Sequence, residues 1–336
     1  MSLKPRLNEK LQEGQPCLFV GAFKFQSSEP HLQALEIIGL NMKGVEIGFP
    51  PIKIDSGEEA HIITGVSGEL MKIDRNLQPI GNVVKPFPAP ITSSEIIGKR
   101  WVGIWIEREI GQGRMAALNI DEEWFDGESK AELRISNGLA IHPNSNIWSQ
   151  YLDTEPTALS EINDTICFAS NKGIYRIDVD SKEIWRSEHP KWEEIKLGGD
   201  QIIGFADSEE GLIVISQAGG VAIFDEEGVL KEKRVINLPE LITGFVFEEG
   251  LGLFLKLNGT FIATMENIRD MPVIYHNKGP VYHAISRDSE WIWTGWRHDG
   301  KISSGNITTK SRDDIGIGII GDNVLTNNGE WDKIRI

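Results

Sequence analysis

Short runs in which apolar and polar positions alternate recur along nearly the whole chain, separated by turns rich in Asn, Asp and Gly. The clearest unit spans residues 163–185, where an alternating run meets a tight Asn171-Lys172-Gly173 turn and a third run ends at Trp185. Alternation with period two and Asn/Gly punctuation predicts a three-stranded antiparallel meander. One such sheet buries too little apolar surface to offset its ordering entropy, so we expect several to pack together.

Similar hairpins follow one another along the chain at a regular spacing. Their turn glycines, 39–60 residues apart, are Gly68, Gly113, Gly173, Gly220, Gly259 and Gly300. Prolines between the hairpins keep the same phase and are Pro51, Pro88, Pro143, Pro190, Pro239 and Pro280. Proline has no N–H to donate to a neighbouring strand, so it is expected in the crossings between sheets and not inside them. A period of roughly 40–50 residues with four short strands is typical of a β-propeller blade.

We therefore predict an all-β fold, with residues 1–336 as a single β-propeller domain of seven four-stranded antiparallel blades. The predicted blades cover about residues 5–50, 51–88, 89–142, 143–190, 191–238, 239–279 and 280–320, with a closing hairpin at 321–336. The tail is expected to pair with the N-terminal segment and close the ring, which removes exposed sheet edges. Eight blades are the alternative. Residues 121–160 are longer than one crossing by about a strand pair. The extra length is either a rim feature specific to a partner or a longer hairpin without a role.

The unit at residues 163–185 resembles the repeat of the pyrroloquinoline-quinone-type β-propellers, which is WD40-like. The resemblance covers about one blade and rests on Gly173-x-Tyr175-x-Ile177-Asp178, Ser181-Lys182-Glu183 and Trp185. In that family Gly opens the third strand and Trp closes the fourth. The resemblance implies the propeller fold. The vicinal cysteines and the calcium signature that quinoprotein dehydrogenases carry are missing from this sequence.

Charge and composition narrow the classes of partner. The chain has 34 Lys and Arg against 50 Asp and Glu, a formal net charge of −16. Such a surface repels phosphate backbones and anionic lipids, so we predict neither nucleic acid nor a membrane as a partner. The first residues, 1–14, are polar, and no apolar run approaches the roughly 18 residues of a membrane span, which predicts a cytoplasmic protein. Cys17 and Cys167 lie in apolar runs, which favours buried thiols over a disulfide or a catalytic pair.

The turns of the predicted blades alternate between two faces. One face collects acidic turns with few bases to offset them, including Asp55, Glu58 with Glu59, and Glu209 with Glu210. The other carries cationic and aromatic side chains, a composition found in recognition patches. We predict that this second face binds a protein partner through Arg108, Lys172, Lys256, Arg297, His298, His276, Lys278 and Trp192. The alternative is that acidic turns are simply usual in an acidic protein.

Residues that could carry chemistry are few. His276, His283 and His298 crowd around the seventh hairpin, and on an innermost strand His283 would face the central channel, where a metal or general base would sit. Their spacing matches no zinc pattern, and phosphate loops, a nucleophile elbow and Cys-x-x-Cys pairs are absent from the sequence. Trp291, Trp293 and Trp296 fit packing between blades.

We therefore predict no cofactor and favour a cytosolic protein-interaction scaffold over an enzyme. The alternative is a channel-centred hydrolase or lactonase-like enzyme, with or without a divalent metal.

Overall fold

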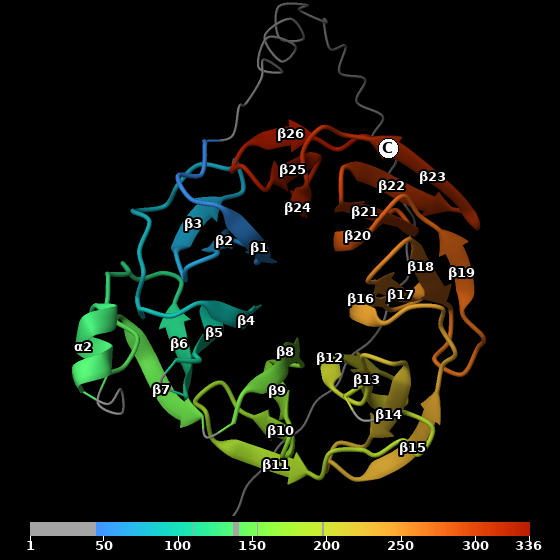
Figure 1. Ribbon diagram of the computed structural model, residues 1–336, viewed down its shortest axis with the longest axis horizontal. Helices are drawn as coiled ribbons and strands as arrows, with labels where there is room; N and C mark the ends of the chain where they lie inside the picture. Colours follow the sequence, from blue (N-terminus) through green and yellow to red (C-terminus); the bar gives the residue numbers. More distant parts are fainter. Residues whose placement is uncertain (1–44, 110, 137–140, 153, 197) are drawn as a thin grey trace, which may run out of the picture. The chain divides into compact units, whose positions relative to one another are not determined.

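The computed structural model describes residues 45–336, apart from residues 110, 137–140, 153 and 197. In this part of the chain, seven antiparallel sheets surround a central opening, as Figure 1 shows. The fold is a seven-bladed β-propeller, which confirms the predicted fold class.

The strands follow the order of the chain within each sheet. The first sheet contains β1 (Pro51–Ser56), β2 (Ala60–Gly65) and β3 (Leu70–Asp74). The second contains β4 (Ile91–Ile97), β5 (Arg100–Glu107), β6 (Gln112–Asn119) and β7 (Asn146–Leu152). The third contains β8 (Pro156–Ile162), β9 (Thr165–Ser170), β10 (Gly173–Ile177) and β11 (Glu183–Ser187). The fourth contains β12 (Ile202–Ser208), β13 (Gly211–Ser216), β14 (Gly220–Phe224) and β15 (Leu230–Val235).

The fifth sheet contains β16 (Ile242–Glu248), β17 (Gly252–Leu257), β18 (Phe261–Met265) and β19 (Val273–His276). The sixth contains β20 (Val281–Arg287), β21 (Glu290–Gly295), β22 (His298–Ser303) and β23 (Asn306–Ser311). The seventh contains β24 (Gly316–Ile320), β25 (Asn323–Thr326) and β26 (Trp331–Lys333). A short helix, α2 (Lys130–Ile135), lies between β6 and β7. No helix in the described part of the chain is long and apolar enough to cross a bilayer.

The core lies between neighbouring blades. Second and third strands are nearly continuous apolar runs because both of their faces are covered, as in β13 and β14. Fourth strands are more exposed, and β15 is mostly polar. Aromatic rings fill the space between blades, and Trp185 stacks on Phe224 with ring centroids 6.5 Å apart.

All seven inner strands share one irregularity. The register shifts once, after the first paired residue of each strand, at Pro51/Lys53, Ile91/Ser93, Pro156/Ala158, Ile202/Gly204, Ile242/Gly244, Val281/His283 and Gly316/Gly318. A β-bulge bends its strand and changes the direction of the next side chain. The same end of the central channel is therefore shaped by a bulge from every blade.

The division of the C-terminal part into blades differs from the predicted one. Residues 321–336 were expected to form a separate closing hairpin, but β24, β25 and β26 form one sheet that begins at Gly316. The spacing in the sequence suggested room for only one strand before residue 321. Both β23, the fourth strand of the sixth sheet, and β24, the first of the seventh, fit there because they are short and only residues 312–315 separate them. Nearly all of the blade predicted at 5–50 lies outside the described residues.

Candidate functional site

The strand directions define two faces of the propeller. We call the ends that carry the turns between second and third strands, together with the crossings between blades, the hairpin face. We call the opposite ends, with the turns from first to second and from third to fourth strands, the acidic rim. This assignment follows from the antiparallel order within each sheet.

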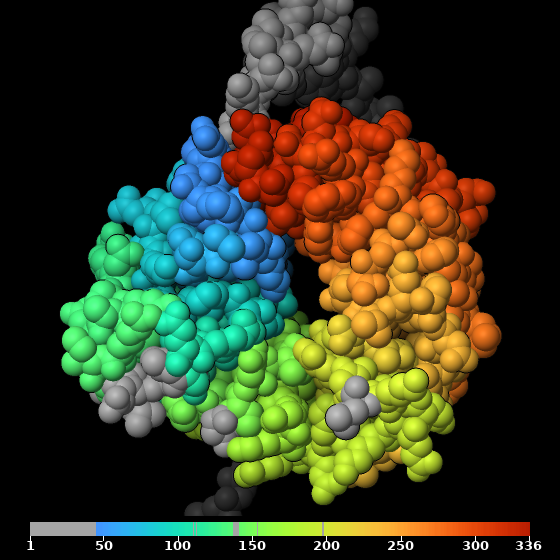
Figure 2. Space-filling view, viewed as in Figure 1, coloured from blue at the N-terminus to red at the C-terminus, as the bar shows by residue number. Residues whose placement is uncertain are grey.

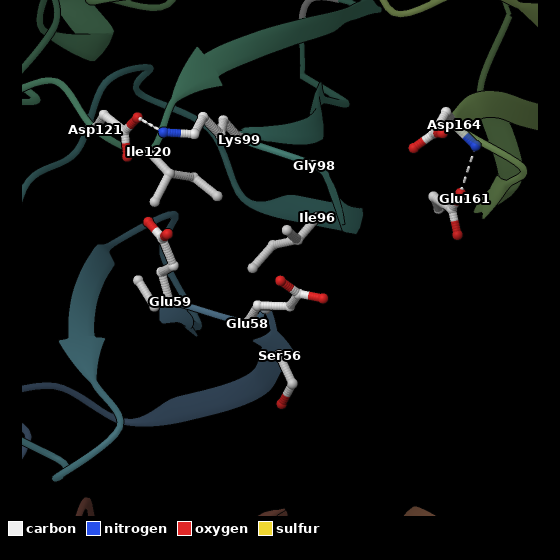
Figure 3. Close-up of a pocket in the computed structure, with 12 residues that line it drawn as sticks. Ser56, Glu58, Glu59, Ile96, Gly98, Lys99, Ile120, Asp121, Glu161 and Asp164 are labelled. Carbon is white, nitrogen blue, oxygen red and sulfur yellow. Dashed lines mark hydrogen bonds and ion pairs between the residues drawn. The ribbon is translucent and has the colours of Figure 1, made fainter. Parts of the chain in front are cut away.

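Carboxylates gather on the acidic rim and line clefts between the blades. Figure 3 shows one cleft, with Glu58 and Glu59 on one side and Glu161 and Asp164 on another. A second cleft is lined by Asp207, Glu209, Glu210, Glu248, Glu249 and Glu266. These side chains come from the turns in which the sequence predicted acidic residues.

More of these carboxylates form ion pairs with Lys or Arg side chains than the turn sequences predicted. Arg269 pairs with Glu210 at 2.6 Å and with Glu232 at 2.9 Å, and Lys99 pairs with Asp121 at 2.7 Å. Asp55 does not belong to the rim surface at all. Its buried carboxylate accepts hydrogen bonds from Trp101 Nε1 at 2.7 Å and Ser94 Oγ at 2.6 Å.

Five of the eight residues predicted to contact a partner are exposed, namely Arg108, Lys172, His276, Lys278 and Arg297. All five lie in hairpin turns, in a crossing or at a strand end on the hairpin face. Arg108 pairs with Glu155 at 2.5 Å, and Lys278 Nζ donates to Ser311 Oγ at 3.3 Å.

Two predicted contact residues, Trp192 and His298, are buried and so cannot form part of a surface. Trp192 donates from Nε1 to the Val221 carbonyl at 3.1 Å, beside a glycine that leaves room for its ring. His298 has partners for both ring nitrogens, the Trp296 carbonyl at 2.8 Å and the Asn277 side chain at 2.8 Å. Burial lowers the pKa of His298.

The prediction from the sequence did not include the exposed aromatic residues of the hairpin face. Trp291 and Trp293 pack between blades as predicted, but Trp296 is 49% exposed. Its backbone N–H donates to the Pro280 carbonyl at 2.9 Å, which holds the β21–β22 turn against the start of β20. Tyr282, the second residue of β20, is 42% exposed. The signal in the sequence is positional, because Trp296 lies in the turn itself and not in the alternating strand.

The side chain of the eighth predicted residue, Lys256, crosses Gly244 of the inner strand β16 toward the inner strand β20. The inner strands surround the central channel, which is visible as an opening in Figure 2. The Nζ of Lys256 donates to the Tyr282 carbonyl at 3.2 Å. Burial, together with the charge of Lys53, lowers the pKa of Lys256 to about 8. Lys53 pairs with Asp55 at 2.6 Å. Burial opposes the charge on Lys53, but Asp55 and Glu95 together outweigh burial and raise the pKa of Lys53.

Two further titratable groups lie in the same channel. Burial raises the pKa of Glu95 to about 7, although Lys53 opposes the shift. Burial and the charges of Lys256 and Lys53 lower the pKa of His283 to about 3, so its ring is neutral at physiological pH. His283 Nδ1 accepts the N–H of Ile319 at 3.3 Å.

The three histidines considered as a cluster do not converge. His276 is exposed at the end of β19, His283 is in the channel and His298 is buried. In the part of the chain that the structure describes, no group of three His, Cys, Asp or Glu residues could hold a metal ion. Cys167 is buried as predicted, and burial raises the pKa of its thiol to about 12, whereas Cys17 lies outside the described residues.

Comparison of the sequence with protein-family models and with curated proteins gave no match. Solved structures do share the fold. The WD40 β-propeller domain of Doa1 has a TM-score of 0.60 at 8% identity, over 86% of this chain and 95% of that one. The computationally designed Ika8 protein has a TM-score of 0.57 at 8% identity, over 88% and 100% of the two chains. BamB from Moraxella catarrhalis has a TM-score of 0.51 at 12% identity, over 84% of each chain.

Proposed function

We propose that this propeller is a protein-interaction scaffold whose hairpin face binds a protein partner. The observation that carries the proposal is the adjacent pair of Trp296 and Arg297, both exposed in the β21–β22 turn. Trp, Tyr and Arg dominate the binding energy of protein interfaces when they lie near the centre of a contact. Tyr282, which is 42% exposed at the start of β20, adds a second exposed aromatic ring to this face.

Hydrogen bonds from neighbouring residues fix the backbone of the turn that carries this pair. Buried His298 contacts the Trp296 carbonyl, and the Arg297 carbonyl accepts the N–H of Arg312 at 3.0 Å. Arg297 adopts a φ of 54°, a left-handed conformation that these contacts maintain. A preorganised contact loses less conformational entropy on binding. His298, predicted as a contact residue, therefore supports the contact from the interior.

The acidic rim suits a partner less well. Its carboxylates are exposed to solvent or paired with bases, and their desolvation would offset much of the attraction to a cationic partner. We infer that the rim mainly keeps the protein soluble.

The proposal is tested with the double variant Trp296→Ala/Arg297→Glu. The full chain is tagged and purified from its own host, and stoichiometric co-purifying proteins are quantified. We expect the double variant to lose its partner by at least about tenfold, since truncation of a central contact typically costs 2 kcal/mol or more.

The matched control is Met271→Ala/Lys182→Glu. It truncates one exposed apolar side chain in the β18–β19 turn and reverses one exposed cation in the β10–β11 turn, both on the acidic rim. This control should retain the partner. Equal recovery of the partner by both double variants and the wild type would refute the proposal. The cytoplasmic location stays a prediction, which fractionation of the host cell tests.

A further inference from the structure

Of the seven inner-strand positions that follow a β-bulge, three lie near the side chain of Lys256. They are Lys53 on β1, Gly244 on β16 and His283 on β20. Bulges are frequent where a strand directs a side chain into a functional site. One of the three positions is a glycine, and this glycine determines where the side chain of Lys256 lies.

Lys256 on β17 is paired with Gly244 in the β16–β17 register. A Cβ atom at position 244 would lie 2.7 Å from Lys256 Cε and 3.0 Å from its Nζ. The lysine side chain therefore lies across the inner strand, in space that any other residue at 244 would fill. Its ammonium group reaches the Tyr282 carbonyl on the inner strand of the next blade.

This ammonium group keeps unused donors. An ammonium has three N–H donors, and the Tyr282 carbonyl takes one of them at 3.2 Å. Among the described residues, no Asp or Glu lies within ion-pair distance of Lys256 Nζ, whereas Lys53 has Asp55. Lys256 is thus a half-buried cation without a counter-ion in the described part of the protein.

His283 supplies a second donor, near enough to Lys256 for the lysine charge to lower the pKa of the His283 ring. The Tyr282 carbonyl that Lys256 contacts belongs to the peptide bond that precedes His283. Because Nδ1 accepts the Ile319 N–H, the neutral ring carries its proton on Nε2. No hydrogen bond between described residues uses this Nε2–H.

We propose that the central channel binds a carboxylate group, held between the Nζ of Lys256 and the Nε2–H of His283. Two separate donors match the two oxygens of a carboxylate. A dianionic phosphate suits the channel less well, because Glu95 and the buried carboxylate of Asp55 both act on the neighbouring Lys53, and the acidic rim lies at the other end of the channel.

The carboxylate could come from a free small molecule or from the end of a polypeptide that enters the channel mouth beside Tyr282. In both cases a carboxylate group would accept hydrogen bonds from Lys256. The site does not depend on whether the hairpin face binds a protein, so the proposed function and this site can fail separately.

The experiment compares the melting temperature of the full-length protein in sodium acetate and in sodium chloride at equal ionic strength and pH 7. A ligand that binds only the folded protein raises the melting temperature as its concentration increases. We expect acetate to raise it relative to chloride. Lys256→Met should weaken acetate binding by about tenfold or more, because the lost hydrogen bond is charge-assisted.

Lys231→Met is the matched control, since Lys231 is an exposed lysine on the outer strand β15, and it should keep the acetate effect. N-acetylglycylglycine and its amide separate the two sources. A stabilising effect of the peptide acid but not of its amide supports entry of a chain end, and an effect of acetate alone supports a free small carboxylate. Absence of any acetate effect in the wild type, or its persistence in Lys256→Met, overturns the site.

Discussion

Lys256 shows how strongly the position of one residue within a blade changes its chemistry. In the sequence it follows an apolar run and precedes a turn, which predicted an exposed cation on the hairpin face. In the structure its side chain passes over Gly244 into the channel instead. A partly desolvated ammonium near a second cation favours its neutral form, so the folded state lowers its pKa.

The lowered pKa gives a pH-dependent prediction for Lys256→Met. The pKa falls from 10.5 in the unfolded chain to about 8 in the folded protein, so the charge destabilises the fold fully below pH 8 and not at all above pH 10.5. In chloride buffer at pH 7 the variant should melt roughly 2–4 °C higher than the wild type, which corresponds to about 1 kcal/mol in a domain of this size.

The difference in melting temperature should shrink as the pH rises from 8 toward 10.5. Lys231→Met serves as the comparison, because its exposed side chain should give no such pH trend. A Lys256→Met protein that melts lower than the wild type at pH 7 would show that the ammonium group stabilises the channel.

At the scale of strands and sheets, local pattern predicted the inner pairs of strands well. The predicted turn glycine Gly220 begins β14 directly after the turn from β13, and the predicted turn glycine Gly259 lies between β17 and β18. These strands are covered on both faces, so their apolar runs are unmistakable. Inner and outer strands are less distinct, because they alternate weakly and a bulge interrupts each inner one. The seventh sheet was therefore divided wrongly.

Contacts between sheets could not be predicted from the sequence, and the buried cluster around Arg312 is the clearest case. Arg312 follows β23 and donates to Asp299 Oδ1 at 2.9 Å, to Thr294 Oγ1 at 3.1 Å and to Asp332 Oδ2 at 3.0 Å. Asp332 belongs to β26, so the guanidinium group connects the sixth and seventh blades. The Arg312 and Asp299 side chains are only 1% and 0% exposed.

Arg312→Met should lower the free energy of unfolding by about 3–5 kcal/mol, because it leaves the buried Asp299 carboxylate without its cation. Chemical denaturation at neutral pH measures this change. Arg269→Met removes an arginine with two exposed ion pairs and should cost less than about 1 kcal/mol per pair. Similar losses for the two variants would contradict the role assigned to Arg312.

At the scale of the whole propeller, the ring closes by contacts between the two ends of the described chain. The Ile47 N–H, before β1, donates to the Gly329 carbonyl at 2.9 Å, in the turn between β25 and β26. Ile47 is buried in an apolar cluster with Met71 of the first sheet and Leu325 of the seventh. The predicted pairing of the tail with residues 1–16 lies outside the described residues, and the contact at Ile47 was not predicted.

Ile47→Ala should lower the free energy of unfolding by about 2–5 kcal/mol, since it opens a cavity where the ring closes. Val45→Ala, at a more exposed position in the same segment, should change it by less than about 1 kcal/mol. Chemical denaturation of both variants checks the prediction. An equally small effect at Ile47 would mean that this segment is not needed for closure.

We propose above all that the hairpin face is the side that meets a partner protein. The most direct test of this proposal is photo-crosslinking in the host cell, with a benzoylphenylalanine placed at Trp296 or at Glu249, which is exposed on the acidic rim of the neighbouring blade. We predict a discrete crosslinked protein from position 296 and none from position 249. Crosslinking from position 249 alone would contradict the claim and assign the interaction to the acidic rim.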